Sequence, residues 1–196
     1  KHPSGLHSYH FNPTGDHHLA GLDHANFTFG DGSDDAAFSV GAWIRPVVGN
    51  VNVIMGKYDS AGNKEEWRFF IDSNGKLSLE LHDASASATE IGVSTDDVTL
   101  GAMQFCCATY DGTNATPDVK LYINGVQNGA GTTAETGSYV AMEDTNAPLT
   151  VGCSGVTATP VAEFHGRIAL PFVTGKELSG ENVVTLYNIG KDLLGI

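Results

Sequence analysis

The chain has 196 residues, with 10 basic and 23 acidic side chains and a formal net charge of −13. Nucleic acid and anionic membrane surfaces are disfavoured as partners, because both are recognised through clustered lysines and arginines. No apolar run approaches the ~20 residues that a membrane-spanning helix needs. The acidity fits a solubilising surface or a calcium-binding one, and both interpretations stay open.

The chain starts at Lys1 rather than Met and shows no secretory signal, so we expect either that an upstream segment was removed or that the chain is one piece of a longer product. Residues 1–7 are expected to be an extended arm. The odd number of cysteines argues against a disulfide framework. Neighbouring residues of a strand point to opposite faces, so Cys106 and Cys107 are not expected to bridge. We expect them and Cys153 to be buried free thiols, which favours folding in a reducing compartment.

Short runs that alternate with period two follow one another along the chain. They are 38–45, 67–72, 76–82 and 119–123, followed by 149–152 and 168–173. The residues expected to face inward are Phe38, Val40, Ala42 and Ile44, then Trp67, Phe69 and Ile71, then Leu77, Leu79 and Leu81, then Val119, Leu121 and Ile123. The pair Asn74-Gly75 between the second and third runs predicts a hairpin.

The turn and loop signals between these runs predict an all-β domain. Asp31-Gly32, Asp111-Gly112 and Asn124-Gly125 are turn signals, and 83–89 and 129–137 are predicted loops. One helix is predicted near the C-terminus: Ser179 caps it, Val183, Leu186 and Tyr187 have helical spacing, and it ends before Gly190. The sequence predicts a single domain over 1–196, a two-sheet antiparallel β-sandwich (jelly roll) with one short helix.

The order of several motifs resembles a known family. The motifs are FSVGAWI at 38–44, IMGKYD at 54–59, ATYDG at 108–112, LYINGV at 121–126, LTVG at 149–152, FHGRI at 164–168 and the helix at 178–187. This order resembles the laminin-G-like branch of the concanavalin A-like lectin/glucanase superfamily over about residues 8–188. The resemblance implies a concanavalin A-like jelly roll, a fold that serves lectins, enzymes, adhesion modules and viral proteins.

Two departures bear on function. Met103-Gln104-Phe105 stands where the family often has Trp, and Ala169-Leu170-Pro171 stands where an Asp of the polar rim often follows. Segments 66–69 and 146–149 also look like laminin-G-like domains of tailed-phage structural proteins.

Catalysis is not expected. Glycosidases of this superfold resemble one another in an E-x-D-x-x-E strand that aims two carboxylates into the cleft. The chain has no such motif: the acids at 80–83 have the wrong spacing, and Asp96-Asp97 is predicted to be a turn. No nucleophile elbow, zinc-protease motif or phosphate-binding loop is present either. We therefore expect a binding or structural module.

Six of the eight histidines fall in the first 24 residues: His2, His7, His10, His17, His18 and His24. The expected role is a polar arm and an edge strand. Metal ligation and a pH-sensitive interface are the alternatives.

The candidate binding residues belong to two possible sites, one for calcium and one for a sugar. The resemblance implies calcium in rim loops, for which Asp31, Asp34 and Asp35 in an early loop and Asp144 with Asn146 in a late loop are the candidates. Sugar binding needs an exposed ring with polar partners. Tyr139, in a loop-like stretch, is expected to be the best outward ring; Tyr122 faces away from its apolar neighbours; Trp67 and Arg68 complete the candidate set.

Two functions of different classes fit these observations. The first is a virion-surface protein, a capsid decoration or fibre domain of a phage-like particle, which docks on neighbouring subunits with or without glycan binding. The alternative is a secreted, calcium-assisted carbohydrate-binding lectin module. The first predicts an apolar interface patch and leaves homo-oligomers open; the second predicts a groove with an exposed ring.

Overall fold

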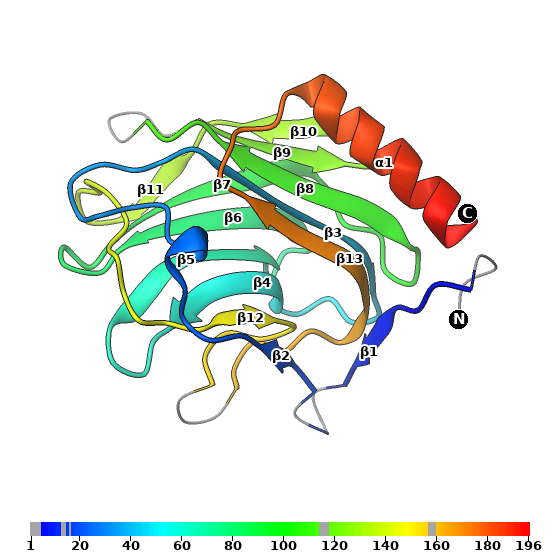
Figure 1. Cartoon of the computed structure of the whole chain (residues 1–196), viewed down its shortest axis with the longest axis horizontal. Coiled ribbons are helices and arrows are strands. Elements are labelled where there is room, and N and C mark those ends of the chain that lie inside the picture. The colour runs from blue at the N-terminus through cyan, green and yellow to red at the C-terminus, as the bar shows by residue number, and fades with distance from the viewer. Residues whose placement is uncertain (1–4, 13–14, 16, 114–117, 157–159) are drawn as a thin grey trace.

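A computed structural model describes residues 5–12, 15, 17–113, 118–156 and 160–196. Two antiparallel sheets are stacked face to face, and one helix lies against the outer face of one of them (Figure 1). The predicted β-sandwich with a C-terminal helix is therefore confirmed. Among the described residues, no helix is long and apolar enough to cross a membrane.

One sheet has six strands in the order β1-β13-β3-β8-β9-β10. Their bounds are β1 Tyr9–Phe11, β13 Gly166–Thr174, β3 Phe38–Pro46, β8 Gln104–Tyr110, β9 Val119–Ile123 and β10 Val126–Ala130. The Asn124-Gly125 turn joins β9 to β10, as its turn signal predicts.

The other sheet has seven strands in the order β11-β7-β6-β5-β4-β12-β2. Their bounds are β11 Thr133–Thr136, β7 Ala88–Asp97, β6 Lys76–Asp83, β5 Lys64–Ile71, β4 Asn52–Asp59, β12 Leu149–Val151 and β2 Leu19–Ala20. A short 3-10 helix, η2 (Ala25–Phe27), follows β2. The predicted hairpin is β5–β6, in which Trp67 pairs with Leu81 and Phe69 with Leu79.

The core lies between the sheets and follows the predicted alternation. The inward residues named for 38–45, 67–72 and 76–82, together with Val119 and Leu121, form one buried cluster, and Ile123 packs against it. A second cluster lies on the outer face of the six-stranded sheet, where the helix covers Trp43, Phe105 and Tyr122. All three cysteines are free and buried. Cys106 belongs to the first cluster and Cys107 to the second, so they face opposite ways as predicted.

Helix α1 (Gly180–Leu194) begins as predicted, with the Ser179 side chain accepting a hydrogen bond from the amide of Asn182. The predicted end before Gly190 is wrong. The helix continues to Leu194 and ends at Gly195, whose φ of 70° lies in the left-handed region that glycine favours. Position 190 lies inside the helix and is occupied by glycine because any Cβ there would lie 2.0 Å from Nε1 of Trp43. Close packing, not termination, requires this glycine.

Two further local predictions are wrong. Asp96-Asp97 ends strand β7 rather than forming a turn, and the predicted loop 129–137 contains strand β11. Both segments are held by strand pairing, which their composition does not reveal: β11 pairs with β7 along the sheet edge. Residues 1–4 of the expected N-terminal arm, with His2, lie outside the described part of the chain.

Candidate functional site

The outer face of the seven-stranded sheet carries a polar and aromatic group that we call the Arg68 cluster. Strand alternation puts its β6 members and the β5 members after Trp67 opposite the core, because their neighbours in the chain are the inward Trp67, Phe69, Leu79 and Leu81. A register shift between Lys57 and Tyr58 places Glu65 directly across from Tyr58. The members are Tyr58 on β4, Glu65, Arg68 and Phe70 on β5, and Ser78, Glu80 and His82 on β6.

Arg68 is the centre of this cluster. Its guanidinium carbon lies 4.6 Å from the ring centroid of Tyr58 and 4.6 Å from that of Phe70. Its Nη2 donates a hydrogen bond of 2.7 Å to Oε2 of Glu80, the residue directly opposite on β6. The Arg68 side chain is 23% exposed and that of Glu80 is 8% exposed. Two rings and an ion pair therefore hold one guanidinium edge in a fixed, partly open position.

Tyr58 and His82 are half-buried beside Arg68, and their rings meet edge to face with centroids 5.9 Å apart. Burial, together with the carboxylate of Glu80, raises the pKa of Tyr58 to about 12. The phenol therefore stays protonated at neutral pH and keeps a hydroxyl that both donates and accepts hydrogen bonds.

Four buried polar atoms of the cluster have no hydrogen-bond partner among the described residues. They are Oε2 of Glu65, Nε of Arg68, Oγ of Ser78 and Nδ1 of His82. Buried polar atoms are nearly always paired, and an unpaired one costs ~1–3 kcal/mol. These four atoms are buried against their neighbours, so the polar group of the cluster that a ligand can reach is the partly exposed guanidinium of Arg68.

Of the four residues predicted to bind a ligand, only Arg68 lies on this face. Trp67 is fully buried in the core and donates through Nε1 to the carbonyl of Phe27 at 3.0 Å. Tyr122 does point away from its apolar neighbours on β9, as predicted, but it is not available to a ligand, because it belongs to the cluster that packs under α1 and is only 4% exposed.

Tyr139 is not the outward ring that the sequence predicts. It is half-buried, packs against the core, and donates to Oδ2 of Asp35 at 2.5 Å. Tyr110 donates to the same oxygen at 2.7 Å, and the amide of Met142 donates to Oδ1 at 2.9 Å. Burial raises the pKa of Asp35 in spite of these hydrogen bonds. Asp35 therefore joins the early loop by hydrogen bonds to the late segment that contains Tyr139 and Met142.

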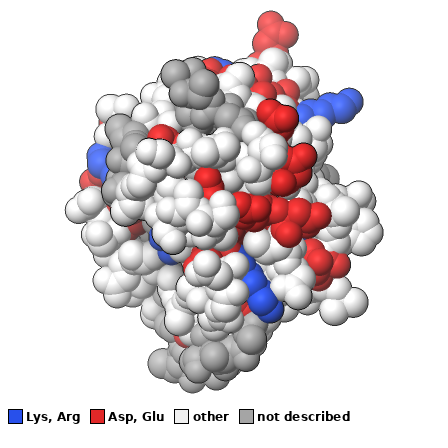
Figure 2. Space-filling view, turned by 90° about the vertical axis from the view of Figure 1, so that its left-hand side faces the viewer, with Lys and Arg blue, Asp and Glu red and all other residues white. Residues whose placement is uncertain are grey.

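The calcium candidates lie in loops that do come together, since the amide of Gly32 donates to the carbonyl of Met142 at 2.8 Å. Figure 2 shows acidic side chains gathered on this end of the sandwich. Asp31 accepts from the amides of Asp34 and Ser33, which lower its pKa, and Asp34, Asp144 and Asn146 are exposed. In the described ranges, no three His, Cys, Asp or Glu residues are placed to hold a metal. Calcium stays a prediction.

The same end of the sandwich holds a buried ion pair. Lys57 and Glu66 are fully buried and in contact, and Nζ of Lys57 also donates to the carbonyl of Thr145 at 2.6 Å. The carboxylate of Asp23 lies 3.0 Å from the same nitrogen. Three acceptors satisfy the ammonium, so this group joins the loops at 23 and 145 to strand β4.

Sequence reasoning missed Tyr58, Glu80 and His82 as site residues. The signal was present: the Asn74-Gly75 turn fixes the β5–β6 register, and that register places Glu80 opposite Arg68. Two opposite charges directly across an antiparallel pair mark an outward face that carries a paired polar site.

A family model described as the concanavalin A-like lectin/glucanases superfamily matches residues 19–184. No curated protein matches the chain. A candidate carbohydrate-binding protein from Bacteroides ovatus aligns with a TM-score of 0.61 and 14% identity, over 90% of this chain but 45% of its own, so the chain spans less than half of that protein.

Two further solved structures cover more of their own length. The CBM40 of the Ruminococcus gnavus IT-sialidase, bound to α2,3 sialyllactose, aligns with a TM-score of 0.59 and 14% identity over 88% of this chain and 98% of its own. The SAP-like pentraxin from Limulus polyphemus aligns with a TM-score of 0.54 and 16% identity over 87% and 81%. These likenesses show the fold. With the family model matching most of its length and the two sheets stacked as the motifs imply, the chain belongs to the concanavalin A-like lectin/glucanase superfamily.

Proposed function

We propose that this domain is a non-catalytic glycan-binding module and that the Arg68 cluster is its binding face. The carrying observation is the partly open Arg68 guanidinium, 23% exposed on that face beside the half-buried rings of Tyr58 and His82. Sugar hydroxyls both donate and accept hydrogen bonds, so a glycan offers acceptors to the exposed part of the Arg68 guanidinium and partners to the Tyr58 hydroxyl. The half-buried rings of Tyr58 and His82 supply apolar surface beside them.

The charges of the cluster favour an uncharged sugar. Glu80 neutralises Arg68 through their ion pair, and Glu65 adds a second carboxylate nearby. An anionic glycan would meet this carboxylate, and the chain as a whole carries a formal charge of −13. We therefore propose a neutral glycan with neighbouring hydroxyls as the ligand.

The non-catalytic assignment rests on three observations. Glu80 is held in an ion pair with Arg68, and the chain has no E-x-D-x-x-E strand. The CBM40 and the Bacteroides ovatus protein, similar in fold, are named for carbohydrate binding.

The test is a glycan array probed with the purified domain, in calcium and again in chelator. We expect neutral glycans to bind equally in both conditions, and Arg68→Ala to lose that binding. Arg45→Ala, on the outer face of the other sheet, is the matched control and should bind as the wild type does. Binding that vanishes only in chelator would restore the calcium site at the acidic loops. No binding to any glycan would refute the proposal.

A second proposed function is attachment to a larger assembly, a virion surface in the case of a phage-like particle. It is favoured by an exposed apolar groove beside α1, lined by Leu170, Ile189 and Leu193 among others. As part of this proposal, the protein is located on a virion surface or, alternatively, outside a cell. Quantitative mass spectrometry of purified particles tests it: the chain should be present at a fixed copy number, and its absence from particles would refute a virion role.

A further inference from the structure

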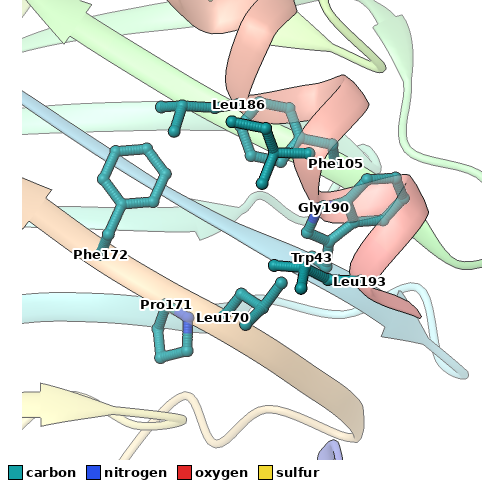
Figure 3. A pocket seen from close by; sticks show the side chains of 9 residues that line it. Trp43, Phe105, Leu170, Pro171, Phe172, Leu186, Gly190 and Leu193 are labelled. Atoms are coloured by element: carbon teal, nitrogen blue, oxygen red, sulfur yellow. The ribbon is translucent and has the colours of Figure 1, made fainter. Parts of the chain in front are cut away.

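A groove of about 290 Å³ runs between α1 and β13 on the outer face of the six-stranded sheet (Figure 3). Its lining is mostly apolar. Trp43 and Phe105 form part of its lining, Leu186, Ile189, Gly190 and Leu193 come from α1, and Leu170, Pro171 and Phe172 come from β13. Leu170, Ile189 and Leu193 are 37%, 49% and 45% exposed. Exposed apolar side chains that converge on a hollow mark a site of contact.

The backbone of β13 is strained at this groove. The register with β3 shifts between Ala169 and Phe172, which inserts one extra residue, and Leu170 has a φ of +48°. A branched side chain in the left-handed region costs of order 1–3 kcal/mol. Bulges of this kind redirect side chains, and this one places Leu170 and Pro171 on the wall of the groove.

A row of basic residues lies next to the groove on the same sheet face. Arg45 is directly opposite Arg167, which is directly opposite His10 on β1. Arg45 is two residues beyond Trp43 on β3, a step of about 7 Å along a strand. Neither arginine makes an ion pair within the described part of the chain. Like charges directly across a sheet repel, so an acidic partner would stabilise this row.

We propose that the groove and the basic row together bind a segment of a partner protein in which one large apolar side chain is flanked by acidic residues. A cavity of ~150 Å³ accommodates a benzene ring, so 290 Å³ admits the side chain of one Leu, Phe or Trp. One buried anchor side chain with charged neighbours is a common mode of peptide recognition. The charge is complementary, because Arg45 and Arg167 lie beside the groove and make no ion pair with any described residue.

The test begins with selection of a random dodecapeptide display library on the folded domain. Enriched peptides should combine a Leu, Phe or Trp with Asp or Glu. The best peptide is then synthesised with a fluorophore, and its affinity is measured by anisotropy at several NaCl concentrations. We expect the affinity to fall as salt rises, because salt screens the arginine contacts.

Three variants locate the site. Ile189→Asp should weaken peptide binding at least tenfold. The double variant Arg45→Gln/Arg167→Gln should weaken it and flatten its salt dependence. Val184→Asp, on another face of α1 and 42% exposed, adds the same charge to the same helix and should bind within twofold of the wild type. Thermal melts confirm that each variant folds.

Several results would overturn the proposal. They are a library that enriches no peptide, enriched peptides without acidic residues, and binding that Ile189→Asp leaves unchanged. Sedimentation equilibrium adds another: self-association that Ile189→Asp abolishes would make a second copy of the chain the occupant of the groove, in place of a different protein.

Discussion

Gly190→Ala should destabilise this protein, although the same change normally stabilises a helix. Alanine is favoured over glycine in a helix interior by up to ~1 kcal/mol. Here the added Cβ would lie 2.0 Å from Nε1, 2.8 Å from Cε2 and 3.0 Å from Cδ1 of Trp43. That indole is 3% exposed and packs against Phe105 and Tyr187, so it has little room to move.

Overpacking of this kind costs about 1–3 kcal/mol, which exceeds the gain in helix propensity. For a domain of this size, each kcal/mol corresponds to a fall in Tm of about 2–4 °C. Urea and thermal unfolding, followed by tryptophan fluorescence and circular dichroism, measure the change.

The matched control is Gly180→Ala at the start of the same helix. Its added Cβ would have the Tyr122 hydroxyl as its nearest neighbour, at 4.0 Å, an ordinary contact distance. This variant should be as stable as the wild type or slightly more so. A Gly190→Ala protein at least as stable as the wild type would refute the close-packing explanation for a glycine inside α1.

Three further predictions test other parts of the fold. Glu80→Ala should lower the free energy of unfolding by about 1–3 kcal/mol, because it leaves the partly buried Arg68 unpaired, and should abolish glycan binding; urea titration and the glycan array measure both. Burial pushes the pKa of Asp83 up, but hydrogen bonds from a hydroxyl and from backbone amides outweigh it and hold the pKa below 3.8. The stability that this carboxylate contributes is therefore present above pH 3.8 and lost as the pH falls through the folded pKa. The free energy of unfolding of the wild type should exceed that of Asp83→Asn at pH 7, and this difference should shrink as the pH falls below 3.8. A difference in the free energy of unfolding that is the same at pH 7 and pH 2.5 would contradict this. Burial raises the pKa of all three thiols, Cys106, Cys107 and Cys153, and for the last two it reaches about 12. A thiol reagent at pH 8 should therefore label none of them in the native protein and all three in urea.

The fold was predictable because its determinants are local. Alternation along 38–45 and 76–82 states which side chains enter the core, and the Asn74-Gly75 turn fixes a register. The end of α1 was not predictable, since glycine at 190 reads as a stop in a local pattern. Its reason is Trp43 on a distant strand.

The candidate site was predictable only in part for a related reason. Alternation states that Tyr122 points away from the core, but not that α1, some 60 residues later in the chain, covers it. Asp35 likewise looks like a free loop acid, yet its partners Tyr110 and Tyr139 are 75 and 104 residues away in the sequence. Arg68 was found because its environment comes from one hairpin and the adjacent strand.

The two proposed surfaces lie on opposite outer faces of the sandwich. The Arg68 cluster is on the seven-stranded sheet, and the groove beside α1 is on the six-stranded sheet, with the main core cluster between them. Sheets stacked ~10 Å apart keep ligands on the two faces from touching, so a glycan and a partner segment can be bound at once. Because Arg68 and Ile189 share no neighbours in either site, the effects of changing them on stability should add within about 0.5 kcal/mol. That arrangement suits a module that is fixed to an assembly by one face and presents the other to glycans.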